Sequence, residues 1–284
     1  MRKLFLILAC LAASVSAFAG RVVTDTIPSR ILGFDVPCNV YLPDGWDAGG
    51  KEYPVVYLLH GLSDTYSCWV EKGRMDMIAD RLISNGEIPP MVIITPNAGH
   101  NDPRKVLNGY FNTPERRYED FFFQDLMPTL EARYRCIGDK RHRAIMGLSM
   151  GGGGSTVYCQ HHPEMFSSCY AMSPWLDEKN AEVRGDAKAK DNLYLTCRSV
   201  REHSAIDFIA GADEATLGKL RTVAWFIDCG DDDFLLHLTF DFYLKMREAG
   251  VPAELRVRDG RHDWYYWPMV LHFALPWAAA GFVQ

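Results

Sequence analysis

The sequence has no run of lysine or arginine, and its formal net charge is −6 at pH 7 over 284 residues. Binding to nucleic acid or to an anionic membrane surface needs a basic patch, so neither partner is expected. Hydrophobic residues make up 48% of the chain, which is enough to bury one sizeable core. These features predict a globular protein whose partner is a small or neutral molecule.

The cysteines show no pattern of a metal site or of a disulfide framework. Of the eight, Cys10 falls in the amino-terminal segment, and the other seven contain no CxxC pair. An odd set without that pair fits neither a zinc ribbon nor a framework of bridges, and no metal is expected. Several cysteines lie inside apolar runs, so we expect most to be small buried side chains, although one or two bridges would suit an exported protein.

The amino-terminal segment, residues 1–19, has the order of charged, apolar and small residues that is typical of a secretory signal peptide. Two basic residues precede an apolar run from Leu4 to Val15, and Ala17-Phe18-Ala19 follows. We therefore expect an exported, periplasmic or extracellular protein whose mature chain starts at Gly20. The alternative, a lipid anchor on Cys10, would leave only about half a dozen apolar residues after the basic pair.

Residues 20–284 alternate between strand-like and helix-like segments, which predicts a single α/β domain with helices on both faces of a mostly parallel sheet. No stretch in it approaches the roughly 18 apolar residues of a membrane span, so no stable membrane insertion is expected.

Two amphipathic segments, 21–27 and 31–42, are joined by Pro28-Ser29 and predict antiparallel strands at the amino end of the sheet. Apolar runs predict parallel strands at 54–59, 91–95, 143–146, 167–172, 223–228 and 253–257. Helical spacing predicts helices at 74–85, 118–134, 149–161 and 235–249, and a last helix at 264–280 interrupted by Pro268 and Pro276.

One serine stands where a strand passes into a helix. The segment Gly147 to Gly151 reads Gly-Leu-Ser-Met-Gly and follows a predicted strand. This is the context of a nucleophile elbow, a strained turn whose flanking glycines leave room beside the serine. The bare pattern occurs by chance in roughly one chain in ten, where it means an ordinary turn. The strand before it, the helix after it and the further glycines 152–154 favour Ser149 as a catalytic nucleophile.

A serine nucleophile needs a base to take its proton and a carboxylate to orient that base, and candidates for both follow along the chain. His262 lies in a glycine-containing turn after the last predicted strand. Among the other histidines, His100 is the strongest alternative because it lies in a loop near the proposed site. Spacing does not choose among Asp231, Asp232 and Asp233. A calcium site in this acidic run is a rival interpretation, but calcium needs about six to eight oxygens around it.

The turn His60-Gly61-Leu62 follows the predicted strand 54–59. One amide of an oxyanion hole normally comes from this position, and the other comes from the residue after the nucleophile. We therefore expect the amides of Leu62 and Met150 to hold the negative charge that develops on the substrate. The alternative is an ordinary turn, because a His-Gly pair alone is weak evidence.

Together these motifs resemble the esterase D-like family of α/β-hydrolases, which includes feruloyl esterases, acetyl xylan esterases, S-formylglutathione hydrolase and the mycobacterial mycolyltransferases. The most specific pieces are residues 58–61, 147–152, 229–235 and 260–264. The resemblance implies an α/β-hydrolase fold for residues 20–284 as one catalytic domain. It also implies that the acid stands directly before the Phe-Leu pair, which selects Asp233. Arg261 departs from the family pattern, in which a second small residue is expected.

The resemblance implies a serine carboxylic-ester hydrolase that forms an acyl-enzyme and needs no cofactor. The segments 109–111 and 118–120 are similar to the bacterial branch that acts on plant polysaccharide esters, so acetyl or feruloyl esters, as small molecules or on a polysaccharide, are the expected substrates. The alternatives are an acyltransferase, a thioesterase like S-formylglutathione hydrolase, and a non-catalytic carbohydrate-binding descendant. The sequence leaves the oligomeric state open.

Substrate contacts are expected from aromatic residues near these motifs, which could stack on a sugar or cinnamoyl ring or belong to the core. The candidates are Trp69, Tyr110, Trp175 and Trp264. The segment 175–219 fits the alternation poorly. We expect it to be an excursion between two sheet strands that partly covers the site and decides substrate choice.

Overall fold

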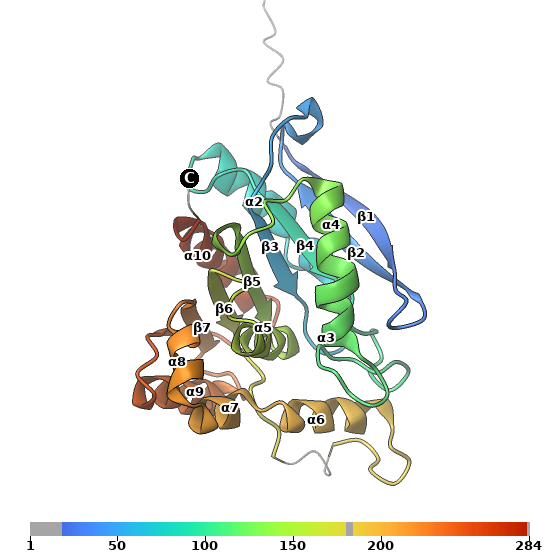
Figure 1. The fold of residues 1–284 in the computed structure, drawn as a ribbon, viewed down its shortest axis with the longest axis vertical. Coiled ribbons are helices and arrows are strands. Elements are labelled where there is room, and N and C mark those ends of the chain that lie inside the picture. The colour runs from blue at the N-terminus through green and yellow to red at the C-terminus, as the bar shows by residue number, and fades with distance from the viewer. Residues whose placement is uncertain (1–18, 180–183, 283–284) are drawn as a thin grey trace, which may run out of the picture.

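The computed structural model describes residues 19–179 and 184–282, so nearly all of the predicted signal peptide, with Cys10, lies outside the described residues. Eight strands form one sheet in the order β1-β2-β4-β3-β5-β6-β7-β8 (Figure 1). Strands β3 to β8 run parallel, whereas β2 pairs antiparallel with both β1 and β4. The strands are β1 (Arg21–Pro28), β2 (Asp35–Leu42), β3 (Val55–Leu59), β4 (Val92–Pro96), β5 (Arg143–Leu148), β6 (Ser168–Met172), β7 (Ala224–Gly230) and β8 (Glu254–Arg258). The predicted mostly parallel sheet with antiparallel strands at its amino end is confirmed.

Helices cover both faces of the sheet, as the alternation predicts. One face carries α1 (Cys68–Glu71), α2 (Met75–Ser84) and α10 (Tyr266–Ala280). The other carries α3 (Tyr118–Phe121), the π-helical turn η2 (Phe122–Leu126), α4 (Met127–Tyr134), α5 (Met150–His161), α6 (Asn192–Glu202), α7 (Ala205–Gly211), α8 (Glu214–Leu220) and α9 (Leu236–Glu248). Two short 3-10 turns, η1 (Trp46–Ala48) and η3 (Lys140–His142), complete the described elements. None of these helices is long and apolar enough to cross a membrane.

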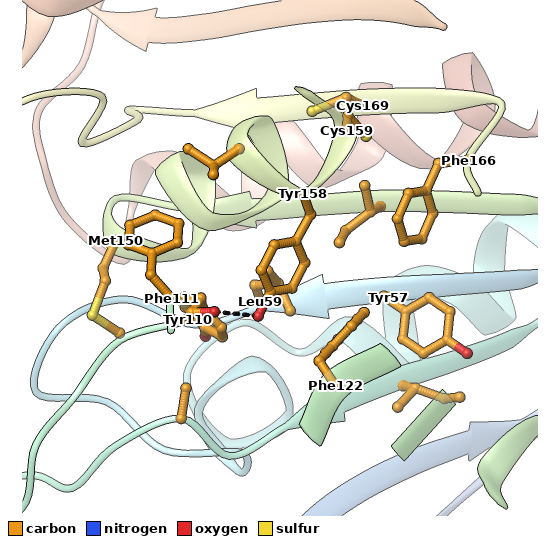
Figure 2. Close-up of a cluster of buried hydrophobic side chains, with 14 of the residues drawn as sticks. Tyr57, Leu59, Tyr110, Phe111, Phe122, Met150, Tyr158, Cys159, Phe166 and Cys169 are labelled. Atoms are coloured by element: carbon orange, nitrogen blue, oxygen red, sulfur yellow. Dashed lines mark hydrogen bonds between the residues drawn. The ribbon is translucent and has the colours of Figure 1, made fainter. Parts of the chain in front are cut away.

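The central strands are buried on both faces, which is why their sequences are continuous apolar runs. In β3, Tyr57 and Leu59 belong to the apolar cluster under α5, and Leu58 belongs to the cluster under α10. Figure 2 shows the first cluster, in which the Tyr158 hydroxyl of α5 donates to the Tyr110 carbonyl. Because both faces are packed, β3 and β5 form a rigid base beneath the loops at their carboxyl ends.

The second predicted strand is shorter than expected. It begins at Asp35, because the chain turns at 30–34. Gly33 has φ +77°, and the Ser29 hydroxyl accepts a hydrogen bond of 2.9 Å from the Leu32 amide. A left-handed residue and a local side-chain hydrogen bond favour a turn over a paired strand, even in an apolar stretch.

The predicted interruption of the last helix is wrong, because α10 is continuous through both prolines. Pro268 lies in the first turn, where an amide has no partner within the helix and its loss costs little. Pro276 lies inside the helix and removes one backbone hydrogen bond. The apolar face of α10, with Val270, Leu271 and Leu275 buried, keeps the helix on the sheet.

The segment 175–219 lies between β6 and β7 and folds into α6, α7 and α8. The sequence analysis does not predict these helices. Each begins with a side-chain cap, from Asp191, Ser204 and Asp213 respectively. The Leu176 carbonyl accepts a hydrogen bond from the Ala205 amide, so the residues directly after β6 are tied to the start of α7.

Candidate active site

Ser149 lies at the point where β5 ends and α5 begins, with φ 53° and ψ −117°. This conformation is sparsely populated for a residue with a side chain and persists only when its surroundings fix it. The Ser149 amide donates to the Met172 carbonyl, and the Ser149 carbonyl accepts from the Gly153 and Trp175 amides, at 2.9 to 3.0 Å. A Cβ atom on Gly151 would lie 2.6 Å from the backbone oxygens of Leu59 and His60. The glycine is therefore required by close approach of β3.

The structure brings the three predicted triad residues into one hydrogen-bonded chain. His262 Nε2 lies 2.9 Å from Ser149 Oγ. On the other side of the ring, His262 Nδ1 lies 2.8 Å and 3.0 Å from the two carboxylate oxygens of Asp233. Because the carboxylate can only accept, Nδ1 carries the proton and Nε2 is free to take the serine proton.

Asp233 is only 5% exposed, and its environment favours the charged form. Burial raises its pKa, but the hydrogen bonds from His262 and from the Leu235 amide outweigh burial, so the pKa lies below its ordinary value. Ser173 also contacts this carboxylate, and it accepts a hydrogen bond of 3.1 Å from the Trp267 indole. The sequence analysis missed Ser173, which carries no motif, and its φ of 45° is visible only in the structure.

The neighbouring acidic residues have other partners. Asp231 accepts a hydrogen bond of 3.0 Å from the Gly260 amide, which ties the loop after β7 to the loop that carries His262. Asp232 lies 3.5 Å from Arg261, with both side chains exposed, so the arginine that departs from the family pattern points away from the triad. Among the described residues, no group of three or more His, Cys, Asp or Glu is arranged to hold a metal ion.

His100, the alternative base, is exposed and accepts a hydrogen bond of 3.0 Å from the Asp102 amide within its own loop. The hydrogen-bonded chain of Ser149 contains His262 instead.

The two proposed oxyanion amides lie on the loops predicted for them. Met150 is the first residue of α5, where backbone amides have no partner within the helix. Leu62 follows His60, whose Nε2 accepts from the Ala98 amide at 2.9 Å while Nδ1 lies 2.8 Å from the Gly61 carbonyl. In the described part of the chain, neither Leu62 nor Met150 donates its amide to a loop, turn or side-chain acceptor. Both are therefore available to a ligand.

Comparison with known proteins identifies the family. The family model described as "Putative esterase" matches residues 29–278. The chain belongs to this esterase family. A solved structure of a ferulic acid esterase is 44% identical, with a TM-score of 0.88, and the match covers 94% of this chain and 100% of that one.

Two further relatives show the range of the family. An endo-1,4-beta-xylanase/feruloyl esterase of Xylanibacter ruminicola is 34% identical over 184 residues, which are 63% of this chain. The match spans only 24% of that relative's own length. An S-formylglutathione hydrolase structure from Staphylococcus aureus is 20% identical with a TM-score of 0.75, over 92% of this chain and 99% of that one, and shows the shared fold alone.

The aromatic residues predicted to contact substrate differ in how far they are buried in this member of the esterase family. Trp69 and Tyr110 are 0% exposed, so the structure places both side chains in the core. Trp69 donates to the Leu59 carbonyl, and Tyr110 donates to the His60 carbonyl. Both therefore support the loop after β3.

Trp264 is partly buried, and its ring lies 5.3 Å from that of Trp267. Trp267 and Phe234 are not among the four predicted contacts, yet their ring centroids lie 5.0 Å and 4.5 Å from that of His262. Phe234 is 66% exposed. An exposed aromatic residue therefore lies against the histidine of the triad.

The seven described cysteines are all buried and unbridged. The expectation that most are small buried side chains is confirmed. Cys159 of α5 and Cys169 of β6 lie next to each other in the apolar cluster of Figure 2.

Proposed function

We propose that this chain hydrolyses carboxylic esters through a serine acyl-enzyme, with Ser149 as nucleophile, His262 as base and Asp233 as the acid that orients it. The observation that carries the proposal is the continuous chain of hydrogen bonds from Asp233 through His262 to Ser149 Oγ. Membership of the esterase family supports the same reaction class.

The proposed cycle uses only groups of this chain. His262 Nε2 takes the proton of Ser149 as the serine oxygen attacks the ester carbonyl, and the amides of Leu62 and Met150 donate to the oxyanion. The protonated histidine then gives its proton to the leaving alcohol. Water, activated by the same histidine, attacks the acyl-enzyme, releases the acid and restores the serine.

We propose acetyl or feruloyl esters of plant polysaccharides as the substrates. The names of the ferulic acid esterase and of the xylanase/feruloyl esterase support this choice. An acyltransferase of the same fold differs only in using an alcohol in the second half-reaction, and a thioesterase differs in the leaving group. The geometry of the triad serves all three reactions, so substrate comparison must separate them.

We also propose that the protein is exported and that residues 20–284 act as one catalytic unit. The amino-terminal pattern of the sequence supports export. The Gly20 nitrogen donates a hydrogen bond of 2.7 Å to Asp80, so cleavage before Gly20 would place a new ammonium group beside a carboxylate.

The test measures hydrolysis of p-nitrophenyl acetate, methyl ferulate, acetylated xylan and a glutathione thioester by the chain from Gly20 onward. Ser149→Ala is expected to lower kcat by at least about 10⁴-fold without loss of folding. Ser84→Ala, on the surface of α2, is the matched control and should retain full activity. A folded wild-type protein that hydrolyses no member of the panel would contradict the proposal, and ester synthesis on added alcohol would indicate a transferase.

A further inference from the structure

A cavity of about 290 Å³ lies beside the triad, between the chain after β6 and the start of α9. One wall is Trp175, whose amide donates to the Ser149 carbonyl. Another is Phe234, whose ring contacts that of His262. The volume is near the lower limit of about 300 Å³ for small-molecule pockets, so it suits a single ring and its substituents.

One carboxylate on the wall of this cavity is incompletely satisfied. Asp177 is 4% exposed, and its Oδ1 accepts a hydrogen bond of 2.8 Å from the Glu178 amide. Its Oδ2 has no hydrogen-bond donor within the described ranges. The Lys179 ammonium lies 3.8 Å away, beyond hydrogen-bond distance. An unpaired buried carboxylate oxygen destabilises a fold, and such groups persist where they serve a ligand.

The neighbouring cation is already engaged. Arg184 forms a 2.7 Å ion pair with Glu178, and its guanidinium lies 4.7 Å from the centre of the Trp175 ring. The arginine is therefore held on the aromatic wall and does not neutralise Asp177. The cavity combines apolar walls, which include the buried Leu238, with one strong acceptor. A ring that carries a hydroxyl group matches both features, because a hydroxyl can donate to the carboxylate and the ring can pack on the aromatic walls.

We propose that Asp177 Oδ2 accepts a hydrogen bond from a hydroxyl group on a substrate ring bound between Trp175 and Phe234. Asp177 is then the residue that selects hydroxylated substrates. The proposal rests on the proposed esterase function. Two sources supply the same chemistry: the phenolic hydroxyl of a feruloyl group on the acyl side, and a sugar hydroxyl on the alcohol side.

The experiment compares kcat/KM of the wild type with that of Asp177→Ala and of the nearly isosteric Asp177→Asn. The esters are methyl ferulate, a feruloylated arabinose, methyl cinnamate and p-nitrophenyl acetate; the last two carry no hydroxyl. Asp177→Ala is expected to lower kcat/KM at least about 10-fold on a hydroxylated ester and less than about 2-fold on the other two. The melting temperature of both variants should equal or exceed that of the wild type, because the change removes a buried carboxylate oxygen that has no hydrogen-bond donor in the described ranges. Asp241→Asn, on the same cavity, is the control for a general effect of charge.

Each outcome decides one question. Loss on both feruloyl esters assigns the bond to the phenolic hydroxyl, and loss on feruloylated arabinose alone assigns it to the sugar. An equal change on all four esters, or no change on any, overturns the role of Asp177 while leaving the esterase function intact. A folded wild type that is inactive on all four esters contradicts the proposed function itself.

Discussion

At the scale of single residues, the site depends on one buried carboxylate with a fixed set of donors. Asp233 accepts from His262 and from the Leu235 amide, and these bonds keep its pKa low despite burial. A charged acceptor at Nδ1 fixes the histidine tautomer that leaves Nε2 free for Ser149. The neighbouring Asp232 is exposed and lies 3.5 Å from Arg261 instead. The adjacent pair therefore offers a natural comparison.

The first prediction concerns this pair. Asp233→Asn should lower kcat on p-nitrophenyl acetate by about 10⁴-fold, because the amide can donate to Nδ1 and stabilise the wrong tautomer. The variant should still fold, since the Asn oxygen can accept from the Leu235 amide. Asp232→Asn should change kcat less than about 2-fold. Similar losses of kcat in the two variants, with folding shown to be intact by circular dichroism, would show that the acid role is not specific to Asp233.

The sequence nominates Ser149 and His262 because each lies in a short motif at the end of a predicted strand. Spacing does not choose among three consecutive aspartates, because that choice depends on which side chain faces the histidine, and Asp233 is selected by the family resemblance alone. Burial of aromatic residues is equally hidden, since Trp69 and Trp264 occupy similar sequence contexts but only one is fully enclosed. Asp177 carries no motif at all.

At the scale of elements, the loop after β3 is held by a buried neutral histidine. His60 accepts from the Ala98 amide and donates to the Gly61 carbonyl, so both ring nitrogens are used. Burial lowers its pKa from 6.5 to about 4. The protonated form would lose the acceptor for Ala98 and place a charge in the interior. The loop that carries Leu62 is therefore most stable when His60 is neutral.

The second prediction follows from that pKa. Between pH 6.5 and 4 the unfolded chain binds a proton at His60 and the folded chain does not, so the free energy of unfolding falls as the pH is lowered through this range. Relative to His60→Gln, the wild type should lose about 2 kcal/mol of stability between about pH 7.5 and pH 5 in urea denaturation. His237→Gln, at an exposed position, should follow the wild type. A pH-independent difference between wild type and His60→Gln would contradict the prediction.

Elements differ in how far the sequence predicts them. The buried parallel strands are predicted correctly, because short continuous apolar runs between turn residues indicate buried strands. The turn at Gly33 is missed because the apolar pattern of the segment favours a strand, although the hydrogen bond that stabilises the turn is local. The continuity of α10 through Pro276 is missed because it depends on packing of the helix on the sheet. The helices α6 to α8 are short, and their caps lie within a polar segment that reads as a loop.

At the scale of the whole molecule, a hydrogen bond to Asp80 holds Gly20 against the folded domain. The carboxylate accepts hydrogen bonds of 2.7 Å from the Gly20 nitrogen and from the Tyr41 hydroxyl. A Cβ on Gly20 would lie 2.5 Å from the Leu42 carbonyl, so only glycine fits there. Cleavage after Ala19 would turn this amide–carboxylate hydrogen bond into an ion pair between an ammonium group and a carboxylate.

The third prediction tests this arrangement. Asp80→Asn should lower the stability of a chain that starts at Gly20 more than that of a chain with one serine added before it. The coupling between the two changes should be about 0.5–1 kcal/mol, the value of a partly exposed ion pair. Additive effects in urea denaturation would show that the ammonium does not pair with Asp80.

The positions of the two chain ends have a consequence for larger proteins. Arg21 pairs with Leu42 beside the amino end of β4, and Gly281 lies in a groove with Ala224 and Glu254, the first residues of β7 and β8. Both ends thus lie at the amino-terminal ends of the parallel strands, whereas the triad lies on loops at their carboxyl ends. A second folded module attached at either end would therefore lie away from the exposed Phe234 beside His262.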